Sequence, residues 1–147
     1  MSIQSVVINP AGDPDLPGVK GLLEKSGLPA LGVAENFSSF LVAKQGARLV
    51  GAIGLEIYGE TGLLRSAVVD SATRNLGIGG KLYDELLRLA RSRGIRKLVL
   101  LTNTAEAYFA RKGFQSIDRT TLTGPVTTSV EFTDACPSHA VCMELTL

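Results

Sequence analysis

The sequence predicts an α+β, or mixed α/β, domain whose sheet is antiparallel early in the chain and contains one parallel crossover. The first observation behind this prediction is a series of short apolar runs separated by glycine from Phe40 to Asp70, which is typical of an antiparallel meander. The second is a change to helical apolar spacing from Ile78 onward, followed by the continuous apolar run of IRKLVLLT. That run indicates a buried strand reached through a helix.

The N-terminal half is expected to contain four strands and at least one helix. Residues Ile3 to Ile8 predict the first strand, and DPDLPGVKGLLEKSG predicts a helix that Gly27 ends. The segment LPALGVAENF is expected to be a loop or a short helix. Two strands joined at Gln45-Gly46-Ala47 follow, and LLRSAVVD predicts the next strand.

The C-terminal half begins with the clearest helix of the chain. Its apolar positions recur at helical spacing, and Gly94 is suited to end it. The run IRKLVLLT then predicts a strand, NTAEAYFARKG a short helix, and FQSID another strand. In the tail, GPVTTSVEF is expected to hold a turn and a short helix, and AVCMELTL a closing strand.

The length of 147 residues favours a single domain spanning residues 1–147. A formal net charge of +1 gives no electrostatic basis for binding nucleic acid or an anionic membrane. No apolar run approaches the ~20 residues of a membrane span. The first residues lack the pattern of a secretory signal, so a cytoplasmic location is expected. Two cysteines and one histidine do not make a zinc site, and we expect no metal.

The stretch RNLGIGG contains three glycines directly before the clearest helix. The first N–H groups of a helix have no partner within the helix, and glycines let a phosphate approach them. A dinucleotide fingerprint needs a third glycine where Leu82 stands, and a P-loop needs a first glycine where Asn75 stands. Neither fingerprint is present, which weakens the hypothesis that the protein is a nucleotide-binding enzyme. A tight turn without a ligand is the structural alternative.

The pattern that fits is [R/Q]-x-x-G-x-[G/A], from Arg74 to Gly79, followed by an aromatic helix that ends in Gly113-Phe114. Together these segments resemble the acyl-CoA-binding motifs of the GNAT superfamily of N-acyltransferases. The resemblance implies a central mixed, mostly antiparallel sheet of about six to seven strands with helices on both faces. It also implies acetyl-CoA as the acyl donor. The implied cofactor-binding residues are Val68, Val69, Arg74, Asn75, Leu76, Gly77, Ile78, Gly79, Gly80, Asn103 and Phe109.

Acetyl transfer needs a neutral amine and a donor for the oxyanion. Glu56 is the candidate general base because it interrupts an apolar strand, where an unpaired carboxylate is rare. The alternative is an ion pair with Arg65 on the next strand, and both interpretations stay open. Arg65 is also a candidate for binding a substrate carboxylate. Backbone N–H groups near Val69 are the candidate oxyanion donors.

In the superfamily, a tyrosine in Y-x-x-x-G-F usually protonates the leaving thiolate, but here that position is Phe109. Tyr108 lies one residue earlier, and one residue turns a helical side chain by about 100°. Tyr108 is therefore a candidate acid or a packing residue, and Phe109 is expected to pack against the pantetheine. Asn103 is a candidate to bond the pantetheine amides, or else an N-cap of the next helix.

The closing segment EFTDACPSHAVCM, with GLEIYG, LLRSAVV and LLTNTAEAYFARKGF, resembles a bacterial subgroup described as arsenic-resistance N-acetyltransferases. This resemblance implies a small amino acid or an arsenic-containing analogue as acceptor, with Arg65 binding its acid group. Cys136 and Cys142 could bind arsenic, but a structural thiol in the core is the stronger interpretation. His139 is expected in a surface loop.

The sequence therefore predicts an acetyl-CoA-dependent N-acetyltransferase that acts on a small-molecule amine by direct attack in a ternary complex. The alternative is a non-catalytic CoA-binding regulatory or sensor module, which the phenylalanine at position 109 favours. Many relatives dimerise, so a homodimer is compatible with the resemblance.

Overall fold

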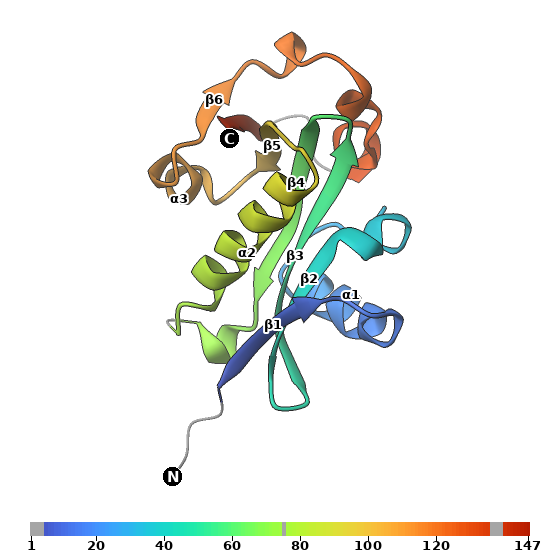
Figure 1. Ribbon diagram of the computed structural model, residues 1–147, viewed down its shortest axis with the longest axis vertical. Helices are drawn as coiled ribbons and strands as arrows, with labels where there is room; N and C mark the ends of the chain where they lie inside the picture. Colours follow the sequence, from blue (N-terminus) through green and yellow to red (C-terminus); the bar gives the residue numbers. More distant parts are fainter. Residues whose placement is uncertain (1–4, 75, 136–139) are drawn as a thin grey trace.

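The computed structural model describes residues 5–74, 76–135 and 140–147, and in these ranges seven strands form one sheet (Figure 1). The strands lie in the order β1-β2-β3-β4-β5-β7-β6. All neighbours are antiparallel except β4 and β5, which are parallel. The bounds are β1 (Val6–Pro10), β2 (Phe40–Gln45), β3 (Arg48–Tyr58), β4 (Thr61–Val69), β5 (Lys97–Thr102), β6 (Gln115–Ile117) and β7 (Val141–Thr146).

Helices cover both faces of this sheet (Figure 1). They are α1 (Leu16–Lys25), α2 (Ile78–Ser92) and α3 (Glu106–Arg111). On β2, Leu41 and Ala43 belong to the core under α2, whereas Phe40 and Val42 belong to the core under α1. Because successive strand side chains point to opposite faces, α1 and α2 lie on opposite sides of the sheet. This arrangement confirms the predicted fold class.

The predicted meander and its hairpin turn are confirmed. Gly46 has φ +63° between β2 and β3, a conformation that glycine adopts without a steric penalty. The first strand differs from its prediction: it spans Val6–Pro10, where each residue pairs with β2, and residues 1–4 lie outside the described ranges. Helix α3 begins at Glu106, later than NTAEAYFARKG suggested, because a turn after β5 precedes it.

Two irregularities in the pairing of β4 leave space for a cavity between β4 and β5. The parallel pairing with β5 covers only Thr61–Leu63 of β4, so the two strands separate beyond it. On the other side, Gly54 pairs with Arg65 and Ala52 with Val68, so two residues of β4 face one of β3. This bulge includes Ser66, whose φ is 58°. The bulge bends β4 at the place where it leaves β5.

Residues 118–135, which follow β6, arch over one end of the sheet and reach the side of β3 and β4 (Figure 1). This arching segment contains short 3-10 turns at Arg119–Thr121 and Pro125–Thr128 and a π-helical turn at Glu131–Ala135. Leu122 and Val126 anchor it in a small core with Leu63 of β4. The short helical structure predicted for this tail is confirmed. Among the described ranges, no helix combines the length and apolar character that crossing a bilayer requires.

Candidate active site

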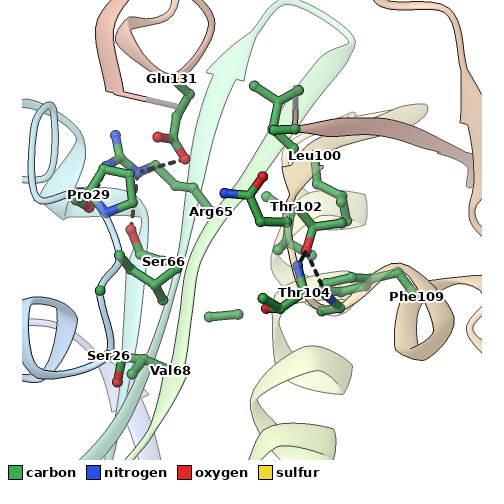
Figure 2. A pocket seen from close by; sticks show the side chains of 18 of the residues that line it. Ser26, Pro29, Arg65, Ser66, Val68, Leu100, Thr102, Thr104, Phe109 and Glu131 are labelled. Carbon is green, nitrogen blue, oxygen red and sulfur yellow. Dashed lines mark hydrogen bonds and ion pairs between the residues drawn. The ribbon is translucent and has the colours of Figure 1, made fainter. Parts of the chain in front are cut away.

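A cavity of about 680 Å³ lies where β4 and β5 separate. Residues 64–69 of β4 and residues 100–105 at the end of β5 form two of its walls. The loop 26–29 after α1, Arg74, Phe109 of α3, Glu131 of the arching segment and Ala140 complete the described lining (Figure 2). The volume lies in the usual range for a small-molecule site.

Six of the residues singled out from the sequence line this cavity: Arg65, Val68, Val69, Arg74, Asn103 and Phe109. Others do not line it, namely Glu56, Leu76, Gly77, Ile78, Gly79, Gly80 and Tyr108. Asn75, Cys136 and His139 lie outside the described residues. The strand separation therefore brings the predicted pantetheine residues together with Arg65.

Arg65 is 3% exposed, and its guanidinium is fixed by three hydrogen bonds. Nη1 donates to Glu56 Oε2 at 2.8 Å, Nε to Ser66 Oγ at 3.1 Å, and Nη2 to the Pro29 carbonyl at 3.3 Å. A guanidinium has five N–H donors. Within the described part of the chain, these bonds use three of them and leave one N–H on each terminal nitrogen without a hydrogen bond, in a side chain that has no solvent-exposed surface.

Glu56 is 1% exposed, and both carboxylate oxygens have partners. The Arg65 guanidinium occupies Oε2, while Ser129 Oγ donates to Oε1 at 2.6 Å and Tyr58 Oη donates to the same oxygen. The Glu56–Arg65 ion pair, which was the alternative to a general-base role, is thus present. A role of Glu56 as general base stays a prediction. Burial, followed by the bond to Glu56, raises the pKa of Tyr58 to about 12.

The glycine turn leaves the first turn of α2 open. Gly77 precedes α2 with φ +75°, and no side chain caps the helix. A Cβ added at Gly77 or Gly80 would meet nothing within 4 Å, and one at Gly79 would meet only Val69 Cγ2 at 3.7 Å. The N–H groups of this turn are therefore accessible to an anion, as a bound diphosphate requires. Ile78, 2% exposed, packs in the core and could contribute only its backbone.

The backbone of Val69 points into the separation between the strands. Asp70 N donates to the Val50 carbonyl on β3 at 2.8 Å. Since successive backbone groups of a strand alternate in direction, the N–H and C=O of Val69 point away from β3, toward β5. Because β5 does not pair there, these groups are available to pantetheine or to the oxyanion of the reacting thioester.

The residues of α3 take different positions around the cavity. Phe109 lines it and is 7% exposed, as expected for a wall beside pantetheine. Tyr108 packs edge-on against Phe109 with ring centroids 5.1 Å apart, outside the lining. The turn before α3 is held by Thr102, whose Oγ1 accepts from Ala105 N at 2.9 Å. Asn103 is therefore exposed beside the cavity and does not cap the helix.

Cys142 is 2% exposed, belongs to the small core with Leu63 and Val99, and burial raises the pKa of its thiol. It is a core residue, as the stronger interpretation predicted. Among the described residues, no cluster of three or more His, Cys, Asp or Glu side chains suits a metal ion.

Glu131, the acidic residue of the described lining, was not expected from the sequence. Its Oε1 lies 3.8 Å from Arg65 Nε, and its side chain is 8% exposed. Ser129, two residues earlier, was missed as well. Both lie in a tail without apolar periodicity, so the only signal was a glutamate between Val130 and Phe132.

The sheet opens between the parallel strands β4 and β5. Strand β4 carries the buried cation Arg65 and leads to the uncapped start of α2. This arrangement suits a transferase that holds a carrier and a small acceptor together. Comparison with known proteins agrees. Residues 17–114 match the family model described as Acetyltransferase (GNAT) family. The chain belongs to the GNAT family and is an acetyl-CoA-dependent N-acetyltransferase.

An amino-acid acetyltransferase from Mycobacterium tuberculosis is 31% identical over 148 residues, which cover 92% of this chain and 80% of that protein. The crystal structure of Rv2747 from the same species, in complex with CoA and a second ligand, has a TM-score of 0.80 at 27% identity and covers 96% of this chain and 99% of that one. N-acetylglutamate synthase from Neisseria gonorrhoeae, complexed with coenzyme A and N-acetyl-glutamate, shares the fold at 21% identity and a TM-score of 0.83. This alignment covers 99% of our chain and 36% of the synthase.

Proposed function

We propose that this enzyme acetylates the amino group of a small amino acid by direct attack in a ternary complex, and that Arg65 binds the acceptor's carboxylate. The observation that carries the proposal is the buried guanidinium in the cavity wall, with one N–H on each terminal nitrogen unused by the described residues. The planar guanidinium of an arginine can donate two parallel N–H bonds to the two oxygens of a carboxylate. The relative named amino-acid acetyltransferase supports this acceptor class.

In this mechanism the protein mainly positions two substrates. Acetyl-CoA supplies an activated thioester, whose thiol is a fair leaving group because its ordinary pKa is about 8.5. The open first turn of α2 and Arg74 would hold the diphosphate, and Val68, Val69 and Phe109 would flank the pantetheine. The Val69 N–H would stabilise negative charge on the thioester oxygen. Arg65 would orient the acceptor so that its amine faces the thioester carbon.

An arsenic-containing amino-acid analogue belongs to the same acceptor class, because it presents the same amine beside the same acid group. The sequence resemblance favours its inclusion. Such an analogue is therefore one arm of the substrate test.

The test measures thiol release from acetyl-CoA with a panel of amino acids, their α-amides and the corresponding decarboxylated amines. We expect amino acids to react with a kcat/KM at least about tenfold above their amides and amines, equivalent to about 1.4 kcal/mol. Equal rates for amides and amino acids would contradict a carboxylate site. Binding of acetyl-CoA with no thiol release for any amine would favour the non-catalytic module instead.

A substitution tests the assigned residue. Arg65→Lys keeps the charge that Glu56 needs but loses the planar fork, so the preference for amino acids over amides should fall. Arg48→Lys is the matched control, because Arg48 pairs with Asp70 in an exposed ion pair away from the lining. A preserved preference in Arg65→Lys would remove Arg65 from the acceptor site.

A further inference from the structure

We propose that Glu131 is a second substrate-binding residue, which binds the acceptor's ammonium group before that group loses a proton to solvent and attacks as the neutral amine, and which makes the enzyme favour neutral over acidic amino acids. This inference rests on the proposed function, because it concerns the same acceptor site. It adds a residue from the arching C-terminal segment and narrows the substrate class.

The first argument is the position of Glu131 beside Arg65. Both side chains line the cavity, and Figure 2 shows them facing each other on the same wall. The 3.8 Å between Glu131 Oε1 and Arg65 Nε is an ion-pair distance and too long for a hydrogen bond. An amino acid carries its ammonium and carboxylate on one carbon. A carboxylate and a guanidinium side by side therefore match its two charged groups.

The second argument is that hydrogen bonds connect the backbone of Glu131 to Arg65. Its backbone N–H donates to Ser129 Oγ at 3.2 Å, and Ser129 Oγ in turn donates to Glu56 Oε1 at 2.6 Å. Glu56 also holds Arg65. The two proposed substrate-binding residues are thus linked through Ser129 and Glu56, and linked residues lose less entropy on binding than unconnected ones.

The third argument is the local charge. Two carboxylates, those of Glu56 and Glu131, lie within ion-pair distance of the one guanidinium of Arg65. The only other charged residue of the described lining is Arg74, which precedes the glycine turn at the diphosphate end. An amino acid with a neutral side chain adds no net charge. An acidic amino acid brings a second carboxylate for which the described lining offers no further cation.

The test compares kcat/KM for a neutral amino acid and for glutamate in the unmodified enzyme, in Glu131→Gln and in Glu131→Asp. We expect Glu131→Gln to raise the KM of the neutral amino acid about tenfold and to lower the neutral-to-glutamate ratio of kcat/KM by a similar factor. Glu131→Asp, which restores the charge, should recover much of that ratio. Glu35→Gln, an exposed surface change, is the matched control.

A second readout is independent of turnover: calorimetry of the neutral amino acid without acetyl-CoA should show the same loss of affinity in Glu131→Gln. Retained CoA binding would show that the variant is folded. An unchanged KM for the neutral amino acid in Glu131→Gln would overturn the ammonium contact. Equal losses for neutral and acidic acceptors, which leave the ratio unchanged, would overturn the preference for neutral acceptors. Both outcomes leave the proposed function intact. Failure of the unmodified enzyme to bind or acetylate any amino acid would overturn both proposals.

Discussion

Arg65 connects its own strand to three other segments of the chain. It contacts Glu56 on β3, Ser66 on β4, the Pro29 carbonyl in the loop after α1, and Glu131 in the arching C-terminal segment. A buried guanidinium is costly unless it is paired and hydrogen-bonded, so each of these contacts helps to offset its desolvation. The side chain proposed to bind the acceptor therefore also holds the acceptor end of the cavity together.

Gly32 allows the loop after α1 to approach Arg65. It has φ +80°, and a Cβ there would lie 2.8 Å from Arg65 Nη1 and 2.6 Å from Val130 Cγ1. We expect Gly32→Ala to displace the guanidinium and to lower kcat/KM for the amino acid about tenfold or more, because small misplacements are costly in catalysis.

The matched control for Gly32→Ala is Gly59→Ala. Gly59 also has a positive φ, +62°, but a Cβ there would meet nothing within 4 Å. Both variants should lose about 1–2 kcal/mol of stability from backbone strain. Steady-state kinetics and thermal unfolding separate the two effects. Equal kcat/KM values in the two variants would mean that the approach to Arg65 has no consequence for catalysis.

The residues of the site were predictable to different degrees. Glu56 and Arg65 could be paired from the sequence because they lie on consecutive strands of one meander. Ser129 could not be linked to Glu56, since the two are 73 residues apart and meet only through the arching segment. Glu131 was missed for the same reason, because no local sequence pattern predicts which part of the sheet an irregular tail will contact.

At the level of elements, apolar periodicity predicted the regular helices and strands. It did not predict the places where a strand bulges or leaves its neighbour. Helix α2 was clear because Ile78, Leu82 and Leu86 follow a helical spacing and are all at most 2% exposed. The bulge at Ser66 and the separation of β4 from β5 carry no periodic signal. Yet these irregularities create the cavity, so the sequence indicated the elements of the site better than the space between them.

The start of α2 is the element on which CoA binding is expected to depend. Gly79→Val puts a branched side chain at the helix mouth, where the nearest atom is already Val69 Cγ2 at 3.7 Å from a Cβ. We expect the Kd for CoA, measured by calorimetry, to rise about tenfold or more, because one phosphate contact is worth about 1.4 kcal/mol or more.

Gly21→Val is the control for that element. Gly21 lies within α1, and a Cβ there would meet nothing within 4 Å, so the change in helix propensity is comparable. The control should bind CoA normally. Unchanged CoA affinity in Gly79→Val would show that the diphosphate does not lie at this turn, and the catalytic proposal would lose its main support.

At the scale of the whole molecule, one network joins the sheet to the C-terminal segment, and Tyr58 gives it a pH dependence. Its pKa is about 12 in the folded protein, chiefly because of burial and then because it donates to Glu56. In the unfolded chain its pKa is about 10. Between these values the folded protein keeps a proton that the unfolded chain has released. The contribution of Tyr58 to the free energy of unfolding should therefore be fully present and independent of pH below about pH 10, and it should be lost as the pH rises toward about 12.

Tyr58→Phe tests this dependence. The variant removes the hydroxyl that donates to Glu56, so it should be less stable at neutral pH by about 1.5–3 kcal/mol, the usual worth of a hydrogen bond to a charged group. Since phenylalanine does not titrate, its unfolding free energy should fall less steeply above about pH 10 than that of the unmodified protein. Denaturant unfolding across the alkaline range, with tyrosinate absorbance recorded in parallel, measures both quantities. Identical alkaline slopes in the two proteins would show that proton release from Tyr58 is not linked to unfolding, and that the network around Glu56 and Arg65 does not depend on this hydroxyl at high pH.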